Sequence, residues 1–225
     1  MQSESKYLTW AWLATAVLFF VFGTQSAMAA IGTIIGSKHD FSASGPSVTY
    51  KGTTTQVCVY CHSPHSNPGT TPLWNHATTA ATYTLYTSTT LNASMAQPGG
   101  VSKLCLSCHD GTVAIDSFGG AAGTATLKAT GTTSLGTDLS NDHPIGFAYN
   151  AALVTLDPGL KAVTSAATIG TGNAGTIDSK MLFGGQMECA SCHDVHNSTS
   201  GTAVEAKLLR ITTAQSALCT TCHIK

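Results

Sequence analysis

The apolar pattern of the chain is strongest near the N-terminus. Tyr7 to Phe22 is an almost unbroken apolar run without charge, preceded by Lys6 and followed by Ala27-Met28-Ala29. This order predicts a secretory signal peptide over residues 1–29, cleaved before Ala30. A membrane anchor is the alternative, but the run is shorter than the roughly 20 apolar residues that span a bilayer. We therefore expect an exported chain with no stable membrane anchor.

The rest of the chain has little hydrophobic periodicity. Residues 30–50, 119–141 and 159–185 follow neither a helical nor a strand period, so they read as loops, with Thr164 to Gly170 as a candidate strand. Short helices are expected at residues 103–109, where Asp110-Gly111 would end the helix, and before the C-terminus. There, Thr212 and Gln215 offer a capping box. The expected fold is mostly coil and loops, with a few short helices and minimal strand.

Composition limits both the core and the partners. Aromatic residues make up 7% of the chain and charged residues 9%, with a formal net charge of −1. The absence of a basic patch argues against nucleic acid as a partner. With so few large apolar side chains, the chain would struggle to offset its conformational entropy. We therefore expect it to need additional apolar bodies, and to be largely unfolded without them.

The eight cysteines supply the candidate chemistry. All of them fall in C-x-x-C pairs, each followed at once by a histidine: Cys58, Cys61 and His62; Cys105, Cys108 and His109; Cys189, Cys192 and His193; Cys219, Cys222 and His223. A disulfide framework or a zinc ribbon would also use paired cysteines. Neither needs a histidine at the same offset four times. The pattern is that of covalent c-type haem attachment, so it predicts four haems, each with one proximal histidine.

Four haem irons can take four further ligands, and five histidines remain. These are His39, His65, His76, His143 and His196, while Met95, Met181 and Met187 are alternative ligands. Histidines are sufficient to place one on each side of every iron. In that case no coordination position is open to a substrate. Outer-sphere electron transfer is then expected, and the chain would not be an enzyme.

The first and third motifs share an extra histidine. Each reads C-x-x-C-H-x-x-H and ends at His65 or His196, whereas the second and fourth motifs are plain. A histidine three residues after the proximal one cannot easily reach the opposite face of the same iron, but it can reach the iron of an adjacent haem. Residues 30–225 are therefore expected to form one tetrahaem domain. It would consist of two dihaem units, about 30–118 and 186–225, joined by a Gly/Thr/Ala-rich middle.

Several segments resemble the doubled-CxxCH multihaem cytochromes. They are Lys38 to Ser42, Cys58 to His65, Pro72 to Asn75, Leu104 to Thr112, His143 to Gly146 and Glu188 to His196. Within this group the chain is most similar to tetrahaem outer-surface cytochromes of the outer-membrane cytochrome E type, which polymerise into extracellular conductive filaments. The resemblance covers the haem regions and not the intervening loops. It implies that the distal ligands are His39, His65, His143 and His196, with His76 the less favoured alternative.

The resemblance also implies a function. The chain would be the repeating subunit of an extracellular filament, and His39 is the candidate for an axial ligand donated between subunits. Other c-type cytochromes would be the electron donors, and metal oxides or electrodes the acceptors. A soluble periplasmic shuttle between a quinol-oxidising membrane complex and a terminal reductase is the alternative. A multihaem reductase is a third reading, but it needs a vacant iron with acid–base groups nearby.

Overall fold

A computed structural model describes residues 34–47, 50–63, 73–124, 128–170, 172–196 and 206–224. The chain divides into two units, Met1–Ile31 and Gly32–Lys225, and all described residues belong to the second. The signal peptide expected at residues 1–29 lies outside the described residues, as does His65. Among the residues that are described, no helix is both long and apolar enough to cross a membrane.

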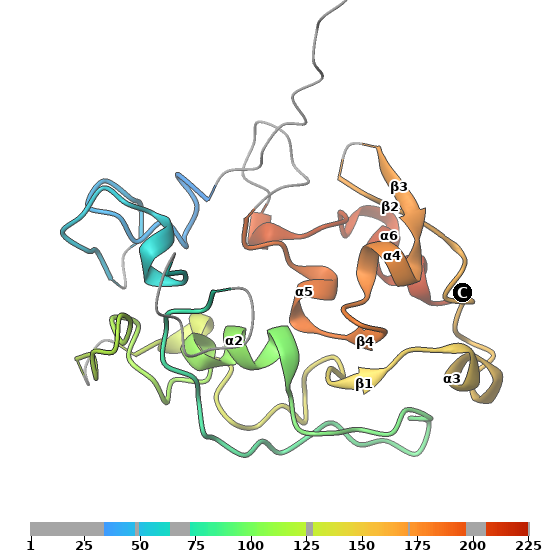
Figure 1. Ribbon diagram of the computed structural model, residues 1–225. Helices are drawn as coiled ribbons and strands as arrows, with labels where there is room; N and C mark the ends of the chain where they lie inside the picture. Colours follow the sequence, from blue (N-terminus) through green and yellow to red (C-terminus); the bar gives the residue numbers. More distant parts are fainter. Residues whose placement is uncertain are drawn as a thin grey trace, which may run out of the picture. The chain divides into compact units, whose positions relative to one another are not determined.

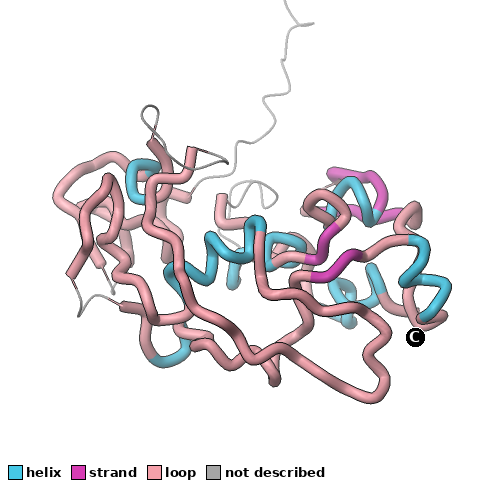
Figure 2. Tube along the Cα trace, turned by 60° about the horizontal axis from the view of Figure 1, so that its bottom comes forward, coloured by secondary structure: helices cyan, strands magenta, loops and turns pink. Residues whose placement is uncertain are grey.

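Loops make up most of the described chain, and the regular elements are short (Figures 1 and 2). The helices are α2 (Gly100–His109), α3 (Ala151–Leu156), α4 (Ile177–Met181), α5 (Cys189–Cys192) and α6 (Ala217–Cys222). The strands are β1 (Phe147–Ala148), β2 (Ala166–Ile169), β3 (Asn173–Thr176) and β4 (Gln186–Met187). Single 3₁₀ turns occur at Cys58–Tyr60, Gly131–Thr133, Ala206–Leu208 and Ala214–Ser216. The expected mostly-coil fold with a few short helices is confirmed.

Helix α2 carries the second haem motif and was expected from the sequence. It begins at Gly100, after Gly99 in an extended conformation, and the backbone N–H of Asp110 closes its last turn on the carbonyl of Leu106. Gly111 then adopts φ +73°, in the left-handed region that glycine enters without steric cost. The predicted stop at Asp110-Gly111 is therefore confirmed.

The segment 159–185 is more ordered than the sequence indicated. Strand β2 lies within the predicted Thr164 to Gly170, but it pairs antiparallel with β3, and α4 follows directly. Helix α4 starts with a capping box, in which Thr176 Oγ1 accepts from the N–H of Ser179 and Ser179 Oγ accepts from the N–H of Thr176. The expectation of a loop here was wrong for β3 and α4. Five helical residues are too few to show a period.

The C-terminal helix is present, but it begins differently from the prediction. A 3₁₀ turn at Ala214–Ser216 precedes α6, and both Gln215 (φ 52°) and Ser216 (φ 59°) are left-handed. Thr212 Oγ1 accepts from the N–H of Ala214 in a local turn. The predicted capping box of Thr212 and Gln215 is therefore wrong, because Gln215 is itself left-handed and lies before the helix, which begins at Ala217.

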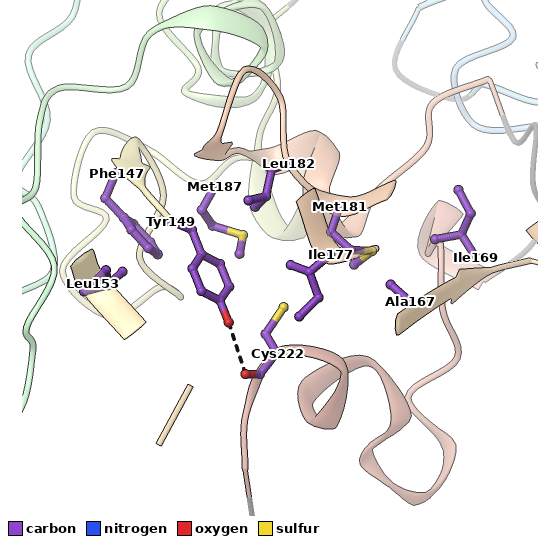
Figure 3. Close-up of a cluster of buried hydrophobic side chains, with 10 residues drawn as sticks. All are labelled: Phe147, Tyr149, Leu153, Ala167, Ile169, Ile177, Met181, Leu182, Met187 and Cys222. Carbon is purple, nitrogen blue, oxygen red and sulfur yellow. Dashed lines mark hydrogen bonds between the residues drawn. The ribbon is translucent and has the colours of Figure 1, made fainter. Parts of the chain in front are cut away.

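The hydrophobic core is larger than the composition suggested. Its main cluster consists of Phe147, Tyr149, Leu153, Ala167, Ile169, Ile177, Met181, Leu182, Met187 and Cys222 (Figure 3). Tyr149 Oη also donates to the carbonyl of Cys222, which ties this cluster to the end of the fourth motif. A smaller cluster of Tyr83, Leu106 and Leu139 lies beside α2. The main cluster comes mostly from the middle of the chain, where the sequence predicted little more than loop.

Candidate haem sites

The four motifs lie on short helical turns, and each histidine is the last residue of its turn or lies within two residues after it. The first motif forms a 3₁₀ turn, the second ends α2, and the third and fourth form α5 and the end of α6. All eight cysteines lie in the described residues, and all are free thiols. The alternative of a disulfide framework is therefore not what the structure adopts. A free thiol in each position is what attachment of a haem vinyl group needs.

Successive motifs adjoin one another in chain order. Burial, and then the proximity of Cys61, raise the pKa of the Cys108 thiol to about 12. A hydrogen bond between Cys105 and Cys189 raises the pKa of Cys105 and lowers the pKa of Cys189. Burial and the neighbouring Cys189 and Cys219 raise the pKa of Cys192. The thiols of motifs one to four thus form a series of neighbours, each within electrostatic range of the next.

Helices α2 and α5 hold the second and third motifs together. Glu188, which is buried, accepts through Oε2 from the N–H of Ser102 at 2.9 Å. Ser102 Oγ in turn accepts from the N–H of Cys189 at 2.9 Å. These bonds satisfy one backbone donor in the first turn of each helix, where donors lack an intrahelical partner. They also connect the two predicted dihaem units directly.

Two proximal histidines have a defined tautomer. His109 donates from Nδ1 to the carbonyl of Thr133 at 2.7 Å, and His193 donates from Nδ1 to the carbonyl of Lys207 at 2.8 Å. A carbonyl only accepts, so the proton of the neutral ring sits on Nδ1 and the lone pair on Nε2. Metal-binding histidines commonly have this second-shell arrangement. Both rings are therefore prepared to bind iron through Nε2.

Three predicted distal histidines lie next to proximal ones. The ring centroids are 5.8 Å apart for His39 and His109, 6.0 Å for His62 and His196, and 6.4 Å for His143 and His223. Two imidazoles that bind one metal ion from opposite sides, at metal–nitrogen distances of about 2.0–2.1 Å, have ring centroids roughly 6 Å apart. The three pairs therefore have the spacing of axial ligand pairs. Among the described residues, His193 has no such ring partner, and His65 lies outside them.

His39 shows the electrostatic cost of this clustering. Burial, and then the nearby His109 and His193, together lower its pKa to about 4. Its Nδ1 is buried without a hydrogen-bond partner. A neutral imidazole with a buried, unsatisfied nitrogen fits a ligand whose metal completes the site. Its position beside His109 of the same chain does not favour donation to another subunit.

His76 and the methionines lie in structural positions. His76 is buried, with Nδ1 2.7 Å from the carbonyl of Ala77 and Nε2 3.0 Å from that of Ala114. Each ring nitrogen thus has a backbone carbonyl within hydrogen-bond distance, and Nε2 also lies 3.6 Å from Cys108 Sγ. Met181 and Met187 belong to the main hydrophobic cluster, and Met95 packs against it. His76 therefore has polar contacts with the backbone, and the three methionines have apolar contacts with the main cluster.

Three motifs are flanked by a short segment, and of these segments only Pro72 to Asn75 was singled out from the sequence, through the resemblance. Isolated antiparallel bridges pair His62 with Trp74, His193 with Leu209 and His223 with Leu160. Each bridging residue is apolar and is followed by a side chain that carries N–H donors: Asn75, Arg210 and Lys161. A search for an apolar residue followed by such a donor would have found them, but their distance from the motif varies. Two of them follow the motif and one precedes it by about 60 residues.

The described residues thus fit covalently bound c-type haem. The cysteines would hold the porphyrin through thioether bonds, and the histidine pairs would hold the iron from both sides. When bound, such a haem supplies a one-electron redox centre whose potential depends on its axial ligands and surroundings. What the chain contributes is the placement of these centres next to one another.

Comparison with known proteins supports this assignment for the C-terminal part. Residues 183–225, which contain the third and fourth motifs, match the family of the doubled CXXCH motif. No curated protein matches the chain. The match covers less than half of the chain, and the N-terminal part repeats the same C-x-x-C-H pattern at Cys58 and Cys105. Together they support the assignment of the chain as a multihaem c-type cytochrome that transfers electrons.

Proposed function

We propose that the chain carries four bis-histidine c-type haems and passes electrons along them as the repeating subunit of an extracellular filament. The observation that carries the proposal is the set of three histidine pairs with ring centroids 5.8 to 6.4 Å apart, each containing one proximal and one distal histidine. His193 would complete the set with His65. All four ligand pairs would then come from one chain, so His39 would serve its own subunit.

In this proposal the residues of the chain do three things. The cysteines fix each haem in position, and the histidine pairs occupy both axial sites so that a substrate has no open coordination position. The contact between α2 and α5 through Ser102 and Glu188 keeps the middle two sites adjacent. These roles suit an electron carrier and not an enzyme, which would need a vacant iron with acid–base groups around it.

A filament is favoured over a soluble shuttle because the chain carries little charge. Only 9% of its residues are charged, and the formal net charge is −1. Transient electron shuttles use complementary charged patches to find and leave their partners quickly. In the filament, c-type cytochromes would donate electrons at one end, and metal oxides or electrodes outside the cell would accept them. The alternative is a monomeric periplasmic shuttle with the same haem chemistry.

Two measurements on the mature protein test the proposal. Intact mass and a haem assay should give four haems per chain, and the oxidised protein should have only low-spin ferric signals. A high-spin component in the wild type would instead favour the reductase reading. Electron microscopy of the secreted material should reveal ordered filaments. Particles of single-subunit size would support the shuttle and overturn the filament.

A further inference from the structure

The first motif is held by one residue through two hydrogen bonds. The backbone N–H of Asn75 donates to the carbonyl of Cys61 at 2.8 Å, and its side-chain Nδ2 donates to the carbonyl of Val59 at 2.9 Å. These carbonyls belong to the first x and the second cysteine of C-V-Y-C-H. The N–H of Ser63, just after the proximal histidine, donates back to the carbonyl of Leu73. Asn75 thus fixes the turn from which His62 projects.

The same arrangement recurs at the third motif. The N–H of Arg210 donates to the carbonyl of Cys192 at 2.9 Å, and its Nε donates to the carbonyl of Ala190 at 2.6 Å. The N–H of Asp194 donates to the carbonyl of Leu208. The Arg210 guanidinium also lies 5.4 Å from the centroid of the Phe183 ring, which holds it in place.

The same pair of hydrogen bonds occurs a third time, at the fourth motif. The N–H of Lys161 donates to the carbonyl of Cys222 at 2.8 Å, and its Nζ donates to the carbonyl of Thr220 at 2.5 Å. The N–H of Ile224 donates to the carbonyl of Gly159. In all three copies the two carbonyls belong to the first x and the second cysteine of the motif. The donor residue follows the motif at the first and third sites and precedes it at the fourth, at a different distance in each case.

The second motif shows why the others need this support. It ends a helix of ten residues, so the carbonyl of Leu106, its first x, accepts from the N–H of Asp110 within the same helix. The turns of the first and third motifs span three and four residues, and their last carbonyls have no following helical turn to bond with. An external donor satisfies these carbonyls and fixes the direction of the adjacent imidazole.

We propose that Asn75, Arg210 and Lys161 are equivalent positioning residues for the first, third and fourth haem sites, and that they also set the redox order of these sites. Asn75 is neutral, whereas Arg210 and Lys161 each bring a positive charge into the motif turn itself. A nearby cation stabilises the reduced site, which carries one positive charge fewer, over the oxidised site. The third and fourth sites should therefore be easier to reduce through this contribution than the first. This inference rests on the proposed haem occupancy.

The test is a spectroelectrochemical titration of the mature, haem-loaded protein and its variants. Arg210→Gln keeps a side-chain N–H donor but removes the charge. The midpoint potential of one haem, seen as one component of the titration, should therefore become more negative, while the haem content and the low-spin spectrum are unchanged. Arg210→Lys should restore the wild-type titration, because Lys161 already makes the equivalent contact. Lys180→Gln is the matched control. It removes the same charge from a side chain that bonds Asn173 instead of a motif.

Lys161→Gln provides a second, independent measurement, and it decides the matter if Arg210→Gln fails to assemble. It should shift a different component in the same direction. Asn75→Leu removes the donor without changing charge, so it should alter the electron paramagnetic resonance g-values of one haem. The inference is overturned if neither glutamine variant shifts a component further than Lys180→Gln, or if Arg210→Lys fails to restore it. A wild type with missing or high-spin haems would instead overturn the proposed function.

Discussion

His143 and His76 show how ring hydrogen bonds separate a candidate ligand from a structural histidine. His143 is exposed and donates from Nδ1 to the carbonyl of Pro144 at 2.9 Å. Its ring centroid lies 6.4 Å from that of His223. His76 has a carbonyl oxygen near each ring nitrogen. The sequence predicted the C-x-x-C-H positions because two cysteines and a histidine at fixed spacing within five consecutive residues define them. It could not predict which histidine faces which, because His62 and His196 meet through tertiary contacts across more than 130 residues.

Replacement of His39 should change the spin state of one haem. His39→Ala removes the imidazole whose ring centroid lies 5.8 Å from that of His109, and it alters no cysteine. We expect four haems to remain attached, and one of them to become high-spin ferric because it has lost an axial ligand. Electron paramagnetic resonance of the oxidised variant measures this directly. A wholly low-spin spectrum would show that His39 is not a ligand.

Replacement of His76 should lower the stability of the protein and leave the spin state of every haem unchanged. His76→Leu leaves the buried carbonyl of Ala114 without its partner, and loss of such a bond costs about 1–3 kcal/mol. We expect a lower free energy of unfolding in denaturant titrations and an unchanged low-spin spectrum. A new high-spin signal in this variant would indicate that His76 binds iron after all.

At the scale of elements, length decided what the sequence could predict. Helix α2 has ten residues and a clear stop at Asp110-Gly111, so its pattern was readable. Strand β3 is Asn-Ala-Gly-Thr, which has almost no intrinsic strand preference, and it forms because β2 pairs with it along its whole length. The flanking segments at Asn75, Arg210 and Lys161 are single bridges. Tertiary contact, and not local propensity, specifies elements of this kind.

Ile177 at the start of α4 should be a major contributor to stability. It is fully buried in the main cluster, so Ile177→Ala should lower the free energy of unfolding by about 2–5 kcal/mol through lost apolar contact and a residual cavity. Leu156→Ala is the matched control, because Leu156 is 67% exposed at the end of α3. Its effect should stay within about 0.5 kcal/mol in the same denaturant titration. Similar losses in both variants would contradict the assigned core.

At the scale of the whole described chain, apolar packing and the haem motifs are distributed differently along the sequence. Of the two buried apolar clusters, the larger draws its residues from positions 147–222, and the smaller has Tyr83, Leu106 and Leu139. The haem motifs, in contrast, occur on both sides of residue 147. The composition led to the expectation that the haem-free chain is largely unfolded. The position of the main cluster limits that expectation, since residues 147–222 can bury apolar area without a porphyrin.

The haem-free protein should therefore lose its structure unevenly. In chain produced without haem attachment and kept reduced, amides of β2, β3 and α4 should stay protected from hydrogen exchange, because Ala167, Ile169 and Ile177 pack in the main cluster. Amides of residues 34–47 and 50–63 should be much less protected, since none of these described residues belongs to either cluster. The haem-loaded protein, measured by mass spectrometry in parallel, should protect both regions. Equal protection of both regions without haem would mean that the N-terminal turns hold themselves together. Equal loss would mean that the cluster cannot form until the fourth motif, which contributes Cys222, is anchored to its haem.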